Sequence, residues 1–254
     1  MLILLSPSKT MTQESLIPFP TFTQTLFEKK TKQILDILKN KYTNDLVKLL
    51  SVNYKIASLN AERYLNFKSN PTLNDSLQAI FSYKGEVYSG LGSNSFQTED
   101  LYFAQNHLRI LSGFYGYLRP LDIIQPHRLE MATKINIGKY DNLYAFWRRE
   151  VNEAMYNELK THPDKLIINL ASNEYSRLID LNNIDYKVVT PVFLDSNNGK
   201  LKVISVYAKK ARGHMASFII KNRITKTEQL NTFNEDGYIY NVKLSPDDSP
   251  HFTR

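Results

Sequence analysis

Short apolar runs along the chain predict buried β-strands. Residues 2–5 (LILL) and 166–172 (LIINLAS) are almost wholly apolar, which is typical of central strands. Residues 186–194 and 200–208 are rich in β-branched side chains and are joined by the turn sequence DSNNG, so they predict a hairpin. Residues 238–244 (YIYNVKL) predict a late strand.

Other segments repeat apolar residues at helical intervals. Residues 22–67 predict two or three amphipathic helices, and residues 75–81 predict another. Residues 143–159 and 209–223 each predict one long helix. No repeat or linker divides the chain, so we expect a mixed α/β (α+β) fold with a central sheet and flanking helices in one compact domain spanning residues 1–254.

Three of the apolar runs end in polar clusters: SPSKT after LILL, ASNEY after LIINL, and AKKARG after KVISVY. If these runs are parallel strands of one sheet, their ends share its carboxyl edge, where open α/β sheets bind ligands. That edge would form one basic cleft containing Ser6, Lys9, Asn173, Glu174, Tyr175, Lys209, Lys210 and Arg212.

Residues 104–131 are interpreted as a helix, a glycine hairpin and a second element. Gly113 and Gly116 could turn backbone N–H groups outward toward a phosphate, because they have no Cβ. The arginines of this segment would add positive charge, and an exposed Tyr115 could stack on an unpaired base. The alternative is a buried aromatic hinge with ordinary surface arginines. In both interpretations the arginines are Arg109, Arg119 and Arg128.

The net charge of +7 is concentrated in one stretch. Residues 196–227 contain eight Lys and Arg and no Asp or Glu, which leaves −1 for the remainder of the chain. Such a block favours phosphates, nucleic acid or another anionic surface over a merely solvated face.

The chain has no Cys, which excludes disulfides, thiolate nucleophiles and Cys-based metal sites. It also has no N-terminal signal pattern and no apolar run of membrane-spanning length, so we expect a cytoplasmic protein with no membrane association.

Lys9 is the sharpest single candidate for chemistry. Beside other cations its ammonium would be disfavoured, which suits an amine nucleophile or base, but a lysine that contacts phosphate is the simpler interpretation. Glu130 and Glu174 are candidate acid/base partners, although a carboxylate near arginines more often forms a structural ion pair. His127 and Glu130 have the spacing of half a di-iron site, but no second half is present. We expect no metal and no cofactor.

Several blocks of the sequence resemble one known family. MLILLSPSKTM, GEVYSGL, QNHLRILSGFYGYLRPLDIIQPHRLEM, INLASNEY, PVFLD and ISVYAKKARGHMASFIIKNR occur in the same order in the bacterial peroxide stress protein YaaA family. The resemblance implies hydrogen peroxide resistance, limitation of free iron, a positively charged cleft and a helix-hairpin-helix element that binds DNA. The sequence departs from the usual hairpin, because two residues rather than one separate Gly113 from Gly116.

The leading hypothesis is a cytoplasmic stress protein, expected to be a monomer, that binds duplex or distorted DNA and helps limit iron-dependent oxidative damage. Its DNA-binding residues would be Lys9, Gly113, Tyr115, Gly116, Arg119, Arg128, Lys209, Lys210 and Arg212. The alternative is an enzyme acting on a nucleotide, a base or a phosphorylated small molecule through Lys9 and the AKKARG segment. A third possibility is a scaffold whose basic face binds an acidic protein.

Overall fold

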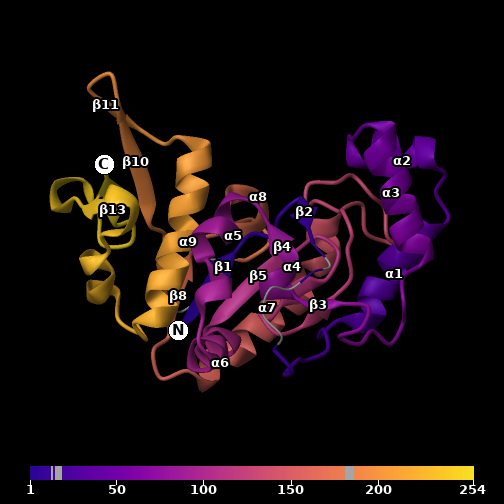
Figure 1. Ribbon diagram of the computed structural model, residues 1–254, viewed down its shortest axis with the longest axis horizontal. Helices are drawn as coiled ribbons and strands as arrows, with labels where there is room; N and C mark the ends of the chain where they lie inside the picture. The colour runs from indigo at the N-terminus through magenta and orange to yellow at the C-terminus, as the bar shows by residue number, and fades with distance from the viewer. Residues whose placement is uncertain (13, 15–18, 181–185) are drawn as a thin grey trace.

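The computed structural model describes residues 1–12, 14, 19–180 and 186–254, and a five-stranded sheet lies at its centre (Figure 1). The strand order is β6-β5-β1-β8-β9, in which every neighbouring pair is parallel except β5 and β6. The five strands are β1 (Leu2–Leu5), β5 (Leu108–Ser112), β6 (Gly116–Leu118), β8 (Leu166–Asn169) and β9 (Lys187–Val189). The predicted mixed α/β fold is confirmed.

The middle of this sheet forms from the most apolar segments of the chain. All residues of β1 and β8 are buried, as expected for parallel strands that are covered on both faces. Each Leu or Ile buried there contributes about 1.5–3 kcal/mol. The predicted helix at 143–159 is confirmed as α7 (Leu143–Thr161), whose Trp147 indole donates a hydrogen bond to the carbonyl of Gly113 at 2.9 Å.

Three amphipathic helices form a separate group at the side of the molecule away from the C-terminus (Figure 1). They are α1 (Glu28–Lys39), α2 (Thr43–Leu50) and α3 (Tyr54–Leu65), so the prediction for residues 22–67 is confirmed. The side chain of Asn53 caps α3 by accepting a hydrogen bond from the N–H of Ile56 at 2.9 Å.

The C-terminal part of the chain forms a second sheet beside helix α9 (Ser205–Lys221). Its order is β11-β10-β13-β12, and the predicted hairpin is confirmed in the antiparallel pair β10–β11. The expected strand at 200–208 is wrong beyond Lys202, because α9 begins at Ser205 and buries an apolar face. The strands are β10 (Val192–Asn197), β11 (Lys200–Lys202), β12 (Ile239–Tyr240) and β13 (His251–Thr253).

The expected helix-hairpin-helix element is wrong. Helix α6 (Thr98–His107) ends before Leu108, and the apolar residues that follow it form β5 of the central sheet. Residues 113–115 then turn the chain into β6, so the segment is a β-hairpin. A short apolar run buried on both faces has no period that separates strand from helix, which explains the error.

The remaining elements are short, and η2, η3 and η4 lie in the C-terminal part beside α9 and the second sheet (Figure 1). The predicted helix at 75–81 is only one turn, α4, preceded by strand β3. No helix within the described ranges is long and apolar enough to cross a membrane. These elements are β2 (Thr10–Met11), β3 (Leu77–Gln78), α4 (Ala79–Ser82), β4 (Tyr83–Lys84), α5 (Glu86–Leu91), β7 (Ile123–Ile124), α8 (Asn173–Ser176), and the 3₁₀ turns η1 (Ser93–Ser95), η2 (Thr227–Thr232), η3 (Glu235–Gly237) and η4 (Val242–Leu244).

Candidate functional site

The carboxyl ends of β1 and β8 lie side by side and hold the polar residues that follow each strand. The Oγ of Ser6, after β1, accepts a hydrogen bond from the N–H of Ser172 at 2.8 Å, and its hydroxyl donates to the Oγ of Ser172 at 3.2 Å. Tyr88 donates to the carbonyl of Ser6 at 3.0 Å. These bonds fix the loops at the edge of the sheet where a ligand site was expected. The third polar cluster, AKKARG, was expected after a strand but lies in the first half of helix α9.

A cavity of about 310 Å³ opens at this edge. Six segments distant in sequence line it: the loop after β1, residues 83–87, Ser112 of β5, residues 127–130, residues 170–175 and helix α9. We call it the edge pocket. Its charged lining residues are Lys9, Lys84, Glu86, Arg128, Glu130, Glu174, Lys209 and Arg212.

Carboxylates hold part of this positive charge in ion pairs. Lys9 Nζ lies 2.5 Å from a carboxylate oxygen of Glu130, whose other oxygen lies 3.2 Å from Arg128. Glu174 accepts a hydrogen bond from the N–H of Ala132 at 3.1 Å. The sequence analysis expected neighbouring cations to disfavour the Lys9 ammonium, whereas the structure places the Glu130 carboxylate directly against it.

Arg212 and Lys209 differ from these paired cations. In the part of the chain that the structure describes, neither has a carboxylate partner, and both side chains line the edge pocket. Arg212 is half-buried, and burial lowers its guanidinium pKa from the ordinary value, although an arginine stays charged in proteins. A half-buried guanidinium without a counter-ion attracts an anion into the pocket.

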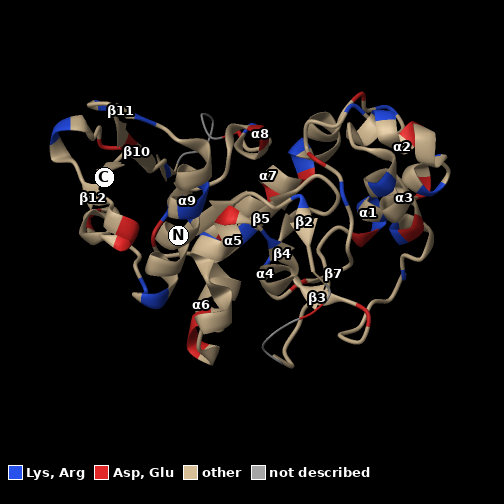
Figure 2. Ribbon diagram, turned by 45° about the horizontal axis from the view of Figure 1, so that its top comes forward, with Lys and Arg blue, Asp and Glu red and all other residues tan. Residues whose placement is uncertain are grey.

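A second cavity, of about 480 Å³, adjoins the first and shares Lys9, Arg128 and Glu130 with it. It adds Lys48 from α2 and Lys134. We call the two cavities together the basic groove. Its lining contains seven Lys and Arg side chains and three Glu side chains. Figure 2 shows Lys and Arg on α9 and on the α1–α3 group, on either side of the central strands.

Several predicted binding residues lie elsewhere. Gly113 and Gly116 are buried, and the N–H groups of the intervening residues donate inward to the Oγ of Ser112 at 3.2 and 3.1 Å. The hairpin therefore presents no N–H groups to a phosphate, contrary to expectation. The expected exposure of Tyr115 is also wrong, because only 3% of it is exposed and its hydroxyl accepts a hydrogen bond from the N–H of Gln125.

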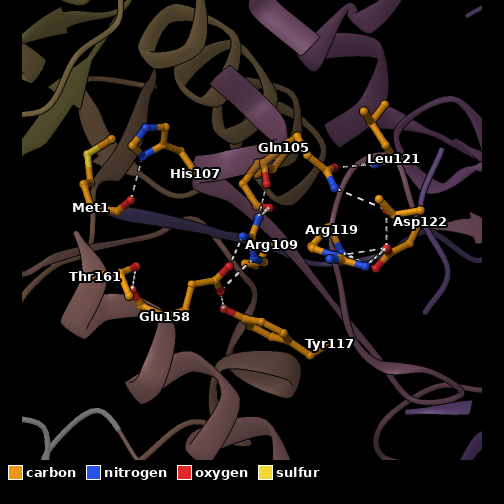
Figure 3. Close-up of polar contacts among 12 residues, drawn as sticks. Met1, Gln105, His107, Arg109, Tyr117, Arg119, Leu121, Asp122, Glu158 and Thr161 are labelled. Atoms are coloured by element: carbon orange, nitrogen blue, oxygen red, sulfur yellow. Dashed lines mark hydrogen bonds and ion pairs between the residues drawn. The ribbon is translucent and has the colours of Figure 1, made fainter. Parts of the chain in front are cut away.

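The other arginines and lysines of the prediction are paired outside the groove. Arg119 donates to Asp122 at 2.8 Å and to the carbonyl of Gln24 at 2.7 Å, and Lys210 Nζ lies 3.9 Å from Asp236. Arg109 is buried in β5 and forms an ion pair with Glu158 of α7 (Figure 3). The predicted residues that line the groove are Ser6, Lys9, Arg128, Glu130, Glu174, Tyr175, Lys209 and Arg212, whereas the predicted Asn173 does not line it.

The groove also contains residues that the sequence did not single out for binding. Lys48 and Lys134 come from segments with no motif, and only the fold brings them to Lys9. Tyr83, Ser112 and His127 line the edge pocket. His127 was considered only as half of a metal site, and among the described residues no three His, Asp or Glu side chains are placed to hold a metal ion.

The fold and the site define a mixed α/β protein with a basic groove at the carboxyl edge of its central parallel strands. A family model described as peroxide stress protein YaaA matches residues 1–244, and the chain belongs to this family. UPF0246 proteins of Aliivibrio fischeri strains MJ11 and ATCC 700601 / ES114 are each 43% identical over 240 residues, which cover 94% of this chain and 93% of each relative. Family membership supports a role in the oxidative stress response.

Proposed function

We propose that this peroxide stress protein binds DNA through the basic groove and thereby helps limit iron-dependent oxidative damage. The observation that carries the proposal is the continuity of the groove, in which two adjoining cavities share Lys9 and Arg128. A single phosphate needs one cluster of cations, whereas a nucleic acid backbone needs a series of them. The unpaired Lys209 and Arg212 lie in one cavity, and Lys48 and Lys134 lie in the other.

The hairpin that carried the original DNA-binding hypothesis has no part in this proposal. Cationic side chains would contact backbone phosphates, and such contacts position the protein without reading sequence. We therefore expect similar affinities for DNA duplexes of different sequence.

The charge-loss variants Arg212→Ala and Lys209→Ala test this proposal. Each is expected to weaken duplex binding severalfold at moderate salt, and the double variant more strongly, because a lost phosphate contact reduces affinity for all sequences alike. Fluorescence anisotropy with labelled duplexes measures the effect.

The matched control is Lys200→Ala with Lys202→Ala. Both lysines are exposed on β11, belong to the same acid-free block, and do not line either cavity. Equal losses in the control and in the groove variants would mean that net charge alone governs binding, and the proposed site would be rejected.

The size of the edge pocket favours a second candidate function, an enzyme acting on a nucleotide, a base or a phosphorylated small molecule. A cavity of about 310 Å³ is of ligand size. In this reaction Lys9 would be the amine nucleophile, with Glu130 at 2.5 Å positioned to take its proton.

This second function has a direct chemical test. Borohydride should trap a covalent adduct between Lys9 and DNA with an abasic site or another carbonyl substrate, and Lys9→Arg should abolish trapping while keeping the charge. Lack of adduct with the parent protein, measured by mass spectrometry, would leave Lys9 as a binding residue.

A further inference from the structure

The edge pocket has two chemically different parts. Five of its charged lining residues are Lys or Arg, whereas much of its wall is apolar or aromatic. A ligand that matches both parts must carry an anionic group and a flat, weakly polar ring. The apolar and aromatic lining residues are Pro7, Tyr83, Val87, Leu129, Leu170 and Tyr175.

His127 gives this wall a fixed hydrogen-bond acceptor. Its Nδ1 lies 2.9 Å from the carbonyl oxygen of Gln125. A carbonyl only accepts, so Nδ1 carries the hydrogen and Nε2 keeps its lone pair. Burial lowers the pKa of His127 to about 4, and the ring is therefore neutral at pH 7. The ring stacks on Phe114 with centroids 4.8 Å apart, which holds its orientation.

Within the described residues nothing donates a hydrogen bond to Nε2 of His127, and His127 lines the edge pocket. The hydroxyl of Ser112 already accepts two backbone N–H groups, so its own hydrogen is available to donate. The buried hydroxyl of Tyr83 makes no hydrogen bond of regular geometry with the residues that the structure describes, and Ser112 is close enough to interact with it. A buried polar atom without a partner destabilises the empty pocket, so a ligand group that pairs with it gains affinity.

We propose that the edge pocket binds one nucleotide unit, with its phosphate at Lys209 and Arg212 and with an N–H of its base donated to Nε2 of His127. This inference rests on the proposed nucleic-acid binding and names what enters the pocket. The unit is either a free nucleoside 5′-monophosphate or an unpaired nucleotide within a strand, since both present the same groups. A paired base cannot enter, because its neighbours stack on both of its faces.

Binding of adenosine 5′-monophosphate, inorganic phosphate, a single-stranded dA oligomer and a fully paired duplex tests this inference. His127→Phe keeps a ring against Phe114 but removes the acceptor. The variant is expected to lower the affinity for the monophosphate, the dA oligomer or both about tenfold, which corresponds to the loss of one buried hydrogen bond. Its affinity for phosphate and for the duplex should be unchanged. Arg212→Ala should lower the affinity for all four ligands.

The four ligands distinguish a free nucleotide from a nucleotide within a strand, and they test the nucleotide proposal separately from the DNA proposal. If His127→Phe loses affinity for the monophosphate alone, the pocket binds a free nucleotide. If it loses affinity for the oligomer, the pocket binds a nucleotide within a strand. Equal affinities of the parent and His127→Phe for both ligands overturn the inference. Failure of the DNA proposal is read separately, from duplex binding by the Lys209 and Arg212 variants.

A spectroscopic measurement on the parent protein removes any dependence on the folding of the variant. With ¹⁵N-labelled histidine, the Nε2 resonance of His127 should move toward the hydrogen-bonded range as adenosine 5′-monophosphate is added, and should stay in place with inorganic phosphate. No shift of this resonance at saturating nucleotide also overturns the inference.

Discussion

Replacing Gly213 by alanine is expected to destabilise the protein by at least about 3 kcal/mol. A Cβ at this position would lie 1.9 Å from the carbonyl oxygen of Val87 and 2.6 Å from the backbone nitrogen of Leu91. Both are backbone atoms of the α5 segment, so no side-chain rotation relieves the clash and the two helices must separate. The gain in helix propensity from Gly to Ala, about 1 kcal/mol, is too small to offset this cost.

Urea unfolding followed by circular dichroism measures the effect, and Ser217→Ala on the same helix is the control. Among the described residues Ser217 has no hydrogen-bond partner in another element, so its replacement should change the free energy of unfolding by less than about 0.5 kcal/mol. Because Gly213 follows Arg212, a folded Gly213→Ala protein should also bind DNA more weakly. A parent-like unfolding curve for this variant would show that α5 and α9 do not pack as described.

Replacing Arg109 by alanine is expected to cost about 3–5 kcal/mol, the range for removing one partner of a buried ion pair. Arg109 Nε donates to Glu158 at 2.9 Å, a second guanidinium nitrogen contacts the other carboxylate oxygen, and Tyr117 donates to Glu158 at 2.7 Å (Figure 3). The variant would leave the Glu158 carboxylate in a poorly solvated site without its cation.

The control is Arg149→Ala, on helix α7 itself. Arg149 and Glu153 form an ion pair of 3.1 Å whose side chains are 80% and 60% exposed, and exposed pairs contribute about 0.5 kcal/mol or less. Equal losses of stability from Arg109→Ala and Arg149→Ala would contradict the buried network.

The same network predicts a dependence on pH. Burial raises the pKa of Glu158, but the hydrogen bonds and charge of Arg109 and the Tyr117 hydroxyl outweigh it and hold the pKa below its ordinary value of 4.5. A carboxyl with a lowered pKa stabilises the fold above its unfolded pKa and loses that contribution as the pH falls through the folded value. Stability should therefore decline below about pH 4.5, and less so in Arg109→Ala.

The sequence predicted correctly those elements whose hydrophobic pattern fits only a strand or only a helix. LILL and LIIN became parallel neighbours, and residues 143–159 became α7. Leu108, Ile110 and Leu111 were assigned to a helix because a buried apolar run has no distinguishing period. The β-branched residues before α9 favoured a strand, but packing of the helix against α5 through Gly90 and Gly213 decided the structure.

One part of the candidate site was predictable, because ligands of open α/β sheets bind at the carboxyl ends of the parallel strands. Lys9, Lys209 and Arg212 were named from that rule and lie in one cavity. Lys48 and Lys134 have no signal in the sequence, since only the placement of α2 beside residues 128–134 brings them to the groove. The acceptor on His127 depends on the position of one carbonyl oxygen, which no sequence pattern encodes.

The most direct test of the basic groove is the salt dependence of duplex binding by the parent protein, Arg212→Ala and the Lys200→Ala, Lys202→Ala control. The logarithm of the association constant falls linearly with the logarithm of salt concentration, by about 0.9 for each phosphate contact. We expect Arg212→Ala to flatten this slope by roughly one unit and the control to keep the parental slope. Identical slopes for the parent and Arg212→Ala would contradict this expectation.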